Sequence, residues 1–270
     1  MPAEYRCHVD RYLFFDLPIE TLGITCLVLM LACSEVGFRI GVLARARVDE
    51  AMRSRITIFE GAMLGVLGLL IGFTMSMGAA RFDTRRQLVV DEANAIGTTW
   101  LRSKVMPEPE NAEFAGLLLQ YVDARVQFTK ARNLKELPQE RTITARLQDQ
   151  LWSRATGFAA RDPRSVPAGL LLQTSNQMID LEATRWASFW SHIPDSVLCA
   201  NVLIATLAAT LLGYGFGVIG RRNMISTLML ALSISSVLTV IVDLDRPWQG
   251  YIKVSQQPML DLQRQMKNAH

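Results

Sequence analysis

Three hydrophobic side chains, Leu69, Phe73 and Met77, have the spacing that suggests a function most directly. They recur every four residues in an apolar segment, so a helix places them on one face. In a ring of subunits such a face would form an apolar constriction, which can gate ions by dewetting. The alternative is ordinary contact with lipid, because any membrane-spanning helix exposes apolar side chains. The spacing therefore predicts a candidate gate whose role depends on what the face meets.

Glycines recur in the same segment at steps of four, three and four residues, on what would be one helical face: Gly61, Gly65, Gly68 and Gly72. Small residues in this pattern let a second helix approach closely inside a membrane. The partner face could come from Gly213 and Gly217 of a later apolar segment, which would make the row a packing surface. Alternatively, the row is exposed and lines a pore. The two interpretations differ in whether another helix of the same chain covers the glycines.

Three charged residues lie inside or at the edge of apolar segments, where unpaired charge is costly. Glu35 and Arg39 are four residues apart, a spacing at which opposite charges pair on a helix. Glu60 lies at the same expected depth in the next segment. The spacing predicts a Glu35–Arg39 ion pair at the membrane interface. A charged vestibule for ions is the functional alternative.

Two charged bands follow the second and fourth apolar segments, at what should be one membrane surface: Asp83, Arg85 and Arg86, then Asp243, Asp245 and Arg246. Opposite charges at one depth predict salt bridges that join the helix ends, for example between Asp243 or Asp245 and one of the arginines. A ring of charge that selects ions is the alternative interpretation.

Four apolar segments must hold these residues in place: 17–43, 56–80, 196–219 and 224–242. Each is near or above the roughly 20 residues that a helix needs to cross a bilayer. Hydrophobic residues make up 50% of the chain, yet 20% of the residues are charged and must meet water. We therefore predict an all-α, multi-pass membrane protein. Residues 1–80 would hold the first pair of spans, 81–194 a soluble domain, and 195–270 the second pair and a tail.

The middle segment has the pattern of a soluble bundle of three or four helices. Apolar residues follow helical spacing in series that start at Phe114 and at Ile143, and prolines mark the breaks between them. In residues 81–194, 15 Lys/Arg nearly balance 13 Asp/Glu, so a nucleic-acid-binding surface is not expected. Because no proline interrupts residues 56–105, the second span should continue into the domain as one helix of about 75 Å.

Cysteine and histidine offer no metal-binding or catalytic pattern. The four cysteines and three histidines are scattered, without a C-x-x-C or H-x-x-x-H pair. No nucleophile, base and metal ligand converge in the sequence, so we expect neither a cofactor nor an enzymatic activity.

Arginines in the short loops predict the orientation in the membrane. Residues 44–55 hold four arginines and residues 220–223 hold two. These six outweigh Arg6 and Arg11 before the first span, and Arg246 and Lys253 after the last. Basic residues in short loops favour the cytoplasmic side, so the middle domain would lie outside the cytoplasm. The three arginines of residues 81–86 act against this assignment.

Four stretches carry a resemblance to a known family: Arg85-Arg86-x-x-Val89-Val90-Asp91-Glu92-Ala93-Asn94-Ala95-Ile96-Gly97-Thr98, Tyr121-Val122-Asp123-Ala124-Arg125, Asn176-x-Met178-Ile179-Asp180, and Asp243-Leu244-Asp245-Arg246-Pro247-x-x-Gly250-x-Ile252-x-Val254-Ser255. Because these stretches occur in a characteristic order and spacing, the chain resembles the bacterial bestrophin-like membrane family of unknown function. The resemblance extends from the first span to Leu260.

The architecture is also similar to that of bestrophins, pentameric anion channels in which a long second helix lines the pore. The resemblance implies a homo-oligomeric, anion-permeable channel in a bacterial inner membrane, with lipid and inorganic ions as partners. Leu69, Phe73 and Met77 fit the spacing of the apolar neck of those channels. Bestrophins carry an acidic calcium cluster after the last span, whereas only Asp243 and Asp245 occur here, so calcium gating is not expected.

Two alternatives stay open at this point. The bestrophin resemblance places the middle domain in the cytosol, opposite to the assignment from loop arginines. The main functional alternative is a non-conducting membrane sensor or scaffold, whose helical domain binds a partner and transmits a shift through the second helix.

Overall fold

The protein is helical throughout the part that the computed structural model describes, residues 17–130, 137–246 and 250–269. No strand occurs among these residues, so the all-α prediction is confirmed. The segment ahead of the first span and residues 247–249 of the last motif lie outside the described part. The helices follow in this order: α1 (Ile19–Ala44), the short 3₁₀ helix η2 (Arg45–Arg47), α2 (Glu50–Ser103), α3 (Glu110–Lys130), α4 (Leu137–Ala159), α5 (Val166–Phe189), α6 (Asp195–Ile219), α7 (Met224–Asp245) and α8 (Gln257–Asn268).

Four helices are long and apolar enough to cross a membrane: α1, α2, α6 and α7. The predicted spans 17–43, 196–219 and 224–242 match α1, α6 and α7 to within three residues at each end. The second span is part of α2, which is one uninterrupted helix of 54 residues, as the absence of proline predicted.

The chain divides into two compact units. The membrane unit consists of Met1–Phe82 and His192–Lys253, and the helical unit consists of Asp83–Ser191 and Val254–His270. The helical unit thus contains residues 83–191 of the predicted middle segment 81–194 and, in addition, α8, which the prediction grouped with the second pair of spans. Helix α2 contributes its first part to one unit and its last part to the other.

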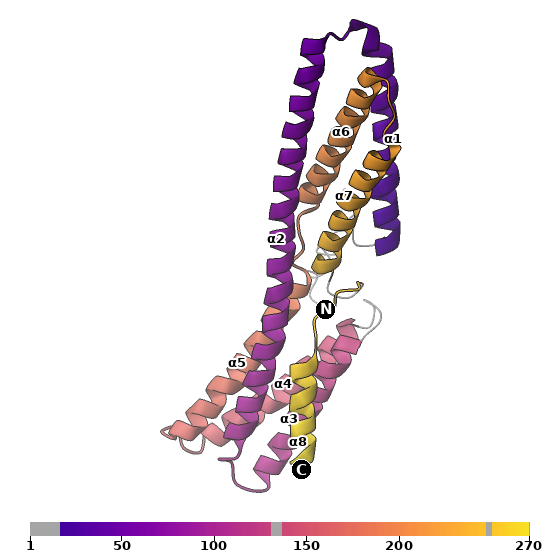
Figure 1. The fold of residues 1–270 in the computed structure, drawn as a ribbon. Helices are drawn as coiled ribbons and strands as arrows, with labels where there is room; N and C mark the ends of the chain where they lie inside the picture. The colour runs from indigo at the N-terminus through magenta and orange to yellow at the C-terminus, as the bar shows by residue number, and fades with distance from the viewer. Residues whose placement is uncertain (1–16, 131–136, 247–249, 270) are drawn as a thin grey trace. The chain divides into compact units, whose positions relative to one another are not determined.

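The two short links of the membrane unit lie at the same end of that unit, here called the link end (Figure 1). Helix α6 stops because Gly220 adopts a left-handed conformation with φ of 79°, which glycine reaches without steric cost. The guanidinium of Arg45 lies against the open side of this glycine. Helix α7 then starts at Met224, and the side chain of the preceding Asn223 caps it by accepting a hydrogen bond from the N–H of Ser226 at 3.2 Å.

Close contact between α1 and α6 organises the membrane unit. Gly37 and Gly41 of α1 face Gly213 and Gly217 of α6, and the backbones approach so closely that a Cβ atom at any of these positions would collide with the other helix. On each helix, three residues separate the two glycines, which is the small-x-x-x-small spacing that permits such contact. The sequence had offered Gly213 and Gly217 as possible partners for the glycines of α2, but the structure pairs them with α1.

Helices α2 and α7 complete the apolar core of this unit. In the membrane unit, a narrow row of α2 is buried, which includes Leu67 and Thr74. The hydroxyl of Thr74 accepts a hydrogen bond from the side-chain amide of Asn201 on α6, with an N–O distance of 2.9 Å. Such a bond between membrane helices contributes about 0.6 kcal/mol. It fixes the rotation of α2, because the buried row must face α6.

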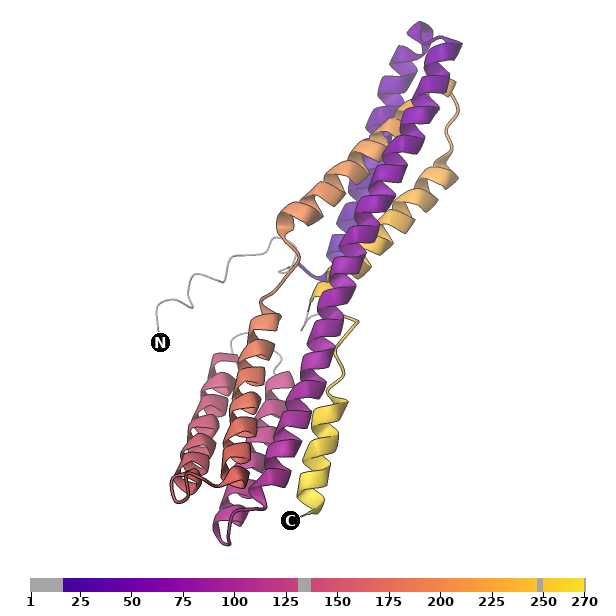
Figure 2. The ribbon, with the colours of Figure 1, turned by 90° about the vertical axis from the view of Figure 1, so that its left-hand side faces the viewer.

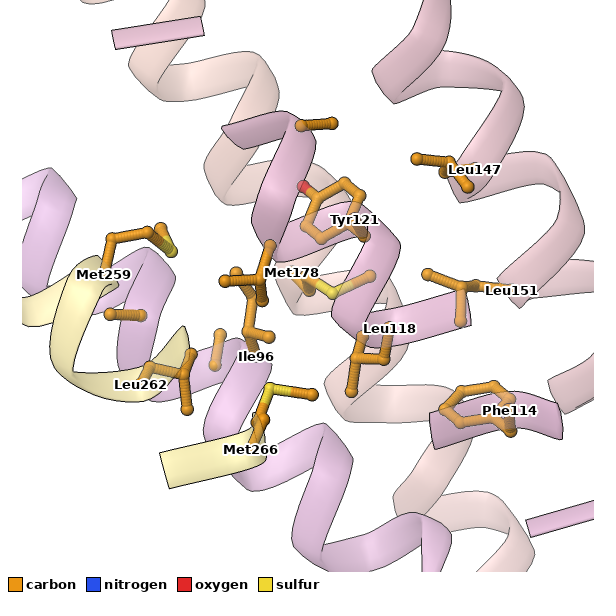
Figure 3. Packing of buried hydrophobic residues seen from close by; sticks show 14 of the residues in the cluster. Ile96, Phe114, Leu118, Tyr121, Leu147, Leu151, Met178, Met259, Leu262 and Met266 are labelled. Atoms are coloured by element: carbon orange, nitrogen blue, oxygen red, sulfur yellow. The ribbon is translucent and has the colours of Figure 1, made fainter. Parts of the chain in front are cut away.

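The helical unit packs its own apolar core. In Figure 2 the last part of α2 lies among α3, α4, α5 and α8. Buried side chains from all five helices meet in one cluster, part of which is shown in Figure 3: Ile96, Phe114, Leu118, Tyr121, Leu147, Leu151, Met178, Met259, Leu262 and Met266. The series predicted from Phe114 supplies the α3 side of this core, and the series predicted from Ile143 supplies the α4 side from Leu147 on, whereas Ile143 itself is exposed.

Replacing a glycine of the α1–α6 contact should destabilise the protein, whereas the same change on α2 should not. In Gly213→Ala the new Cβ atom would meet the carbonyl oxygen of Ser34. Overpacking of this kind costs about 1–3 kcal/mol. Gly65→Ala is the matched control, because a Cβ atom there meets nothing within 4 Å. Thermal unfolding in detergent micelles, followed by circular dichroism, measures both. Equal losses of stability would contradict the assignment of the close contact to α1 and α6.

Candidate functional site

The face of α2 that carries Leu69, Phe73 and Met77 is uncovered within the chain. These side chains are 60%, 62% and 36% exposed, respectively. In the most apolar stretch of α2 only 11% of the residues are buried, against 28%, 39% and 33% in the corresponding stretches of α1, α6 and α7. The face must therefore meet lipid, another subunit or the interior of a pore.

The predicted glycine row lies on this same open side. A Cβ atom added to any of its members would meet nothing within 4 Å: Gly61, Gly65, Gly68 and Gly72. Ser76 and Ala80 continue the row at steps of four and are exposed as well, a continuation that the sequence analysis did not single out although the spacing shows it. Gly78, by contrast, is buried close to Ile241 and Leu244 of α7. Within the chain the row does not act as a packing surface.

The charged residues of α1 form a small cluster at the link end. Arg39 donates to Glu35 with an Nε–Oε1 distance of 2.9 Å. Arg222, from the link between α6 and α7, also reaches Glu35, with an Nη1–Oε2 distance of 3.2 Å. The sequence predicted the contact of Glu35 with Arg39 but not its contact with Arg222. Glu60 has a different neighbour, because its carboxyl group lies against α6 at Gly215.

The aspartates at the end of α7 bind backbone N–H groups of the membrane unit. Asp243 accepts from the N–H groups of Tyr251 and Ile252, at 3.0 and 2.9 Å. Asp245 accepts from the N–H of Ile193 at 2.7 Å. Charged acceptors make strong hydrogen bonds of this type. The two carboxylates thus hold the chain that follows α7 and the chain that precedes α6.

The arginines of the first band belong to the helical unit. Arg85 is 4% exposed and donates to the carbonyl oxygens of Ser188 and Ser191, at 3.2 and 2.8 Å. A cation at the end of α5 satisfies carbonyl groups that have no partner inside the helix. Asp83 and Arg86 are exposed, and Arg246 in the second band is buried. Salt bridges between the two bands stay a prediction.

A buried ionic cluster in the helical unit was not recognised in the sequence. Glu92 of α2 is fully buried and accepts from Arg125 of α3, with an Nε–Oε1 distance of 2.5 Å, and from Arg185 of α5, with an Nη1–Oε2 distance of 2.6 Å. Arg185 also donates to Gln256, at the start of α8, at 2.6 Å. The cluster therefore joins four helices. A signal existed, because Arg125 falls one turn after Tyr121 on the apolar face of α3.

Charge balance decides the protonation states in this cluster. Burial alone would raise the pKa of Glu92, but the adjacent guanidinium of Arg125, and then that of Arg185, outweigh burial and lower this pKa. Burial, followed by the negative charge of Glu92, raises the pKa of the Tyr121 hydroxyl. Glu92 is therefore ionised and Tyr121 neutral at neutral pH. Glu182 lies 3.6 Å from Arg125 and supplies a second negative charge.

The described part of the chain contains no group of three or more His, Cys, Asp or Glu side chains that could hold a metal ion. The geometry offers instead an apolar helix face with a row of glycines in the membrane unit and a buried, charge-paired core in the helical unit. Together the two units define an all-helical, multi-pass membrane protein.

The class can be narrowed by comparison with known proteins. A family profile described as the Bestrophin-like domain matches residues 27–259, and the chain belongs to this family. It is similar to the crystal structure of a bacterial Bestrophin homolog from Klebsiella pneumoniae, with 14% identity, a TM-score of 0.64, and coverage of 91% of this chain and 97% of that chain.

A substituted form of the same homolog gives 15% identity and a TM-score of 0.66, over 93% of this chain and 97% of that one. The crystal structure of a substituted membrane protein gives 11% identity and a TM-score of 0.63, over 88% and 96% of the two chains. No curated protein matches. At these identities the likeness to solved structures establishes the fold.

Removing the central carboxylate of the ionic cluster should strongly destabilise the protein. In Glu92→Gln, the buried Arg185 would lose its carboxylate partner and the buried Arg125 would keep only Glu182, at 3.6 Å. Breaking a buried ion pair in this way costs about 3–5 kcal/mol. Glu110→Gln is the control, because it breaks the exposed Glu110–Arg161 pair, a type worth about 0–1 kcal/mol. Chemical denaturation in micelles compares the two variants. A loss in Glu92→Gln no larger than in the control would contradict a central role for this carboxylate.

The same carboxylate should make stability depend on pH. The pKa of Glu92 is lower in the folded protein than in the unfolded chain, so its contribution is complete above the unfolded value of about 4.3 and is lost as pH falls through the folded pKa. Thermal unfolding between about pH 3 and pH 7 should therefore show a steeper acid decline for the unchanged protein than for Glu92→Gln. Parallel curves would show that other groups cause the acid decline.

Proposed function

We propose that the protein is a homo-oligomeric ion channel in which α2 lines the pore. The observation that carries this proposal is the uncovered face of α2, where Leu69, Phe73 and Met77 alternate with glycines that no other helix of the chain covers. If the glycine row of α2 served only for packing within the chain, it would face small residues of another helix. The candidates, Gly213 and Gly217 of α6, pack against α1 instead. Membership of the Bestrophin-like family supports the same function.

In a ring of subunits, the α2 faces would converge on the symmetry axis. Leu69, Phe73 and Met77 would then form three apolar rings, one turn apart, that exclude water when the pore is narrow. The glycine row would leave room beside them, since it adds no side-chain volume. Heterologous contacts between identical subunits close into such rings when the rotation permits. We propose a ring of five from the resemblance to bestrophins.

Two features support permeation by anions. Residues 61–80 contain no charged side chain, so the proposed pore lacks the ring of carboxylates that favours cations. The link end carries arginines in both loops, among them Arg45, Arg221 and Arg222. Positive charge at a pore entrance raises the local concentration of anions.

We propose further that the protein resides in a bacterial inner membrane with its link end in the cytoplasm. The loop arginines support this orientation, which would place the helical unit outside the cytoplasm. The opposite orientation follows from the bestrophin topology. Accessibility of single engineered cysteines in the exposed part of α4 to a membrane-impermeant reagent, in intact cells, distinguishes the two.

Shortening the central apolar side chain should raise the current. Phe73→Ala would widen the proposed constriction and lower the barrier for a hydrated ion, so channels of the variant should pass several-fold more current. Leu207→Ala is a matched control, because Leu207 is an exposed apolar residue of α6, outside the proposed pore. Purified protein is recorded in planar bilayers with a chloride gradient and a potassium gradient applied separately.

A reversal potential that follows the chloride gradient, together with a changed conductance in Phe73→Ala only, would support the proposal. Silence from inserted, oligomeric protein under both gradients would contradict it. A membrane sensor or scaffold, whose helical unit binds a partner, would then be the favoured function.

A further inference from the structure

Two adjoining cavities lie between α1, α6 and α7 near the link end. The larger has a volume of about 360 Å³, and the smaller one of about 80 Å³ continues it toward Met30 and Ala231. Ser34, Phe216 and Thr227 line both cavities, so the two form one groove, here called the link-end groove.

Apolar side chains make up most of the wall of this groove. They come from three helices: Leu31 and Phe38 of α1, Phe216 of α6, and Ile225 and Leu228 of α7. Ile225 and Leu228 are 74% and 43% exposed, so the groove is accessible from the side of α7. In a bilayer, close packing requires that such a space be filled, and the surrounding medium supplies hydrocarbon chains to fill it.

The mouth of the groove is positively charged. Arg222 lies with its guanidinium carbon 4.4 Å from the centre of the Phe38 ring and contacts Glu35 at 3.2 Å. Glu35 also pairs with Arg39, so one carboxylate serves two guanidinium groups and one positive charge is left over. Arg221 adds a further exposed cation to the same link.

We infer that the link-end groove binds an anionic phospholipid. An acyl chain would occupy the apolar groove, and the phosphate would lie at the mouth against Arg222 and Arg221. The guanidinium of Arg222 is already oriented, because it lies over the Phe38 ring and both of its Nη groups contact Glu35 at 3.2 Å, and its remaining N–H groups can donate to phosphate oxygens. The surplus of positive charge favours a lipid with net negative charge over a zwitterionic one. The lining of the groove comes from α1, α6, α7 and the link between α6 and α7, and includes no residue of the proposed pore helix α2.

The purified full-length protein can be tested by native mass spectrometry in micelles that contain phosphatidylglycerol or phosphatidylcholine at equal concentrations. The unchanged protein should retain phosphatidylglycerol preferentially, by about fivefold for each arginine that contacts the headgroup. Arg222→Gln should lose most of this preference. Thr227→Phe, which narrows the groove where its two cavities meet, should reduce the retention of both lipids.

Arg264→Gln is the matched control, because Arg264 is an exposed arginine of α8, in the helical unit. It should leave lipid retention unchanged. Glycerol 3-phosphate, added alone, should bind too weakly to be retained, since it lacks the acyl chain. Equal retention of the two lipids by the unchanged protein would overturn the inference, as would an unaltered preference in Arg222→Gln. A change of oligomeric state without a change in lipid retention in Thr227→Phe would show that a second copy of the chain fills the groove.

Discussion

Hydrocarbon offers no hydrogen-bond partner to a backbone N–H or C=O group, and the membrane unit is built on this constraint. A helix satisfies these groups within its own segment, and the four candidate spans are all helices. Because lipid tails are as apolar as the side chains, the helices gain little from hiding apolar surface and depend on close approach instead. Gly37, Gly41, Gly213 and Gly217 allow α1 and α6 to come together at backbone distance. The other helices are arranged around this pair.

That pairing determines what α2 can do. Since the close-packing glycines of α6 face α1, the glycine row of α2 has no partner within the chain. Within the membrane unit, a narrow buried row that includes Thr74 faces the other helices, and the hydrogen bond between Thr74 and Asn201 belongs to it. The opposite face, with Phe73 at its centre, is left for contacts outside the single chain. The proposed pore and the family membership are both consistent with this division of α2 into two faces.

The helical unit is stabilised by a different interaction. It buries apolar side chains in a core that draws on five helices. Within this core, Glu92, Arg125 and Arg185 are buried together. Such a cluster is costly to desolvate and costly to break, which favours one arrangement of the helices over others. The lipid groove proposed at the link end uses arginine differently, at a surface where the charge remains available to a ligand.

The sequence by itself determined the all-α class, the four spans and the continuation of α2 past the membrane, because each follows from local hydrophobicity and from where prolines fall. It also placed Leu69, Phe73 and Met77 on one face, since helical periodicity is a local property. Only the tertiary structure decided which glycines pack against each other, that Arg222 joins Glu35, and that Glu92 meets Arg125 and Arg185. These contacts bring together residues far apart in the chain, and their pairing depends on the rotation and separation of whole helices, which periodicity does not specify.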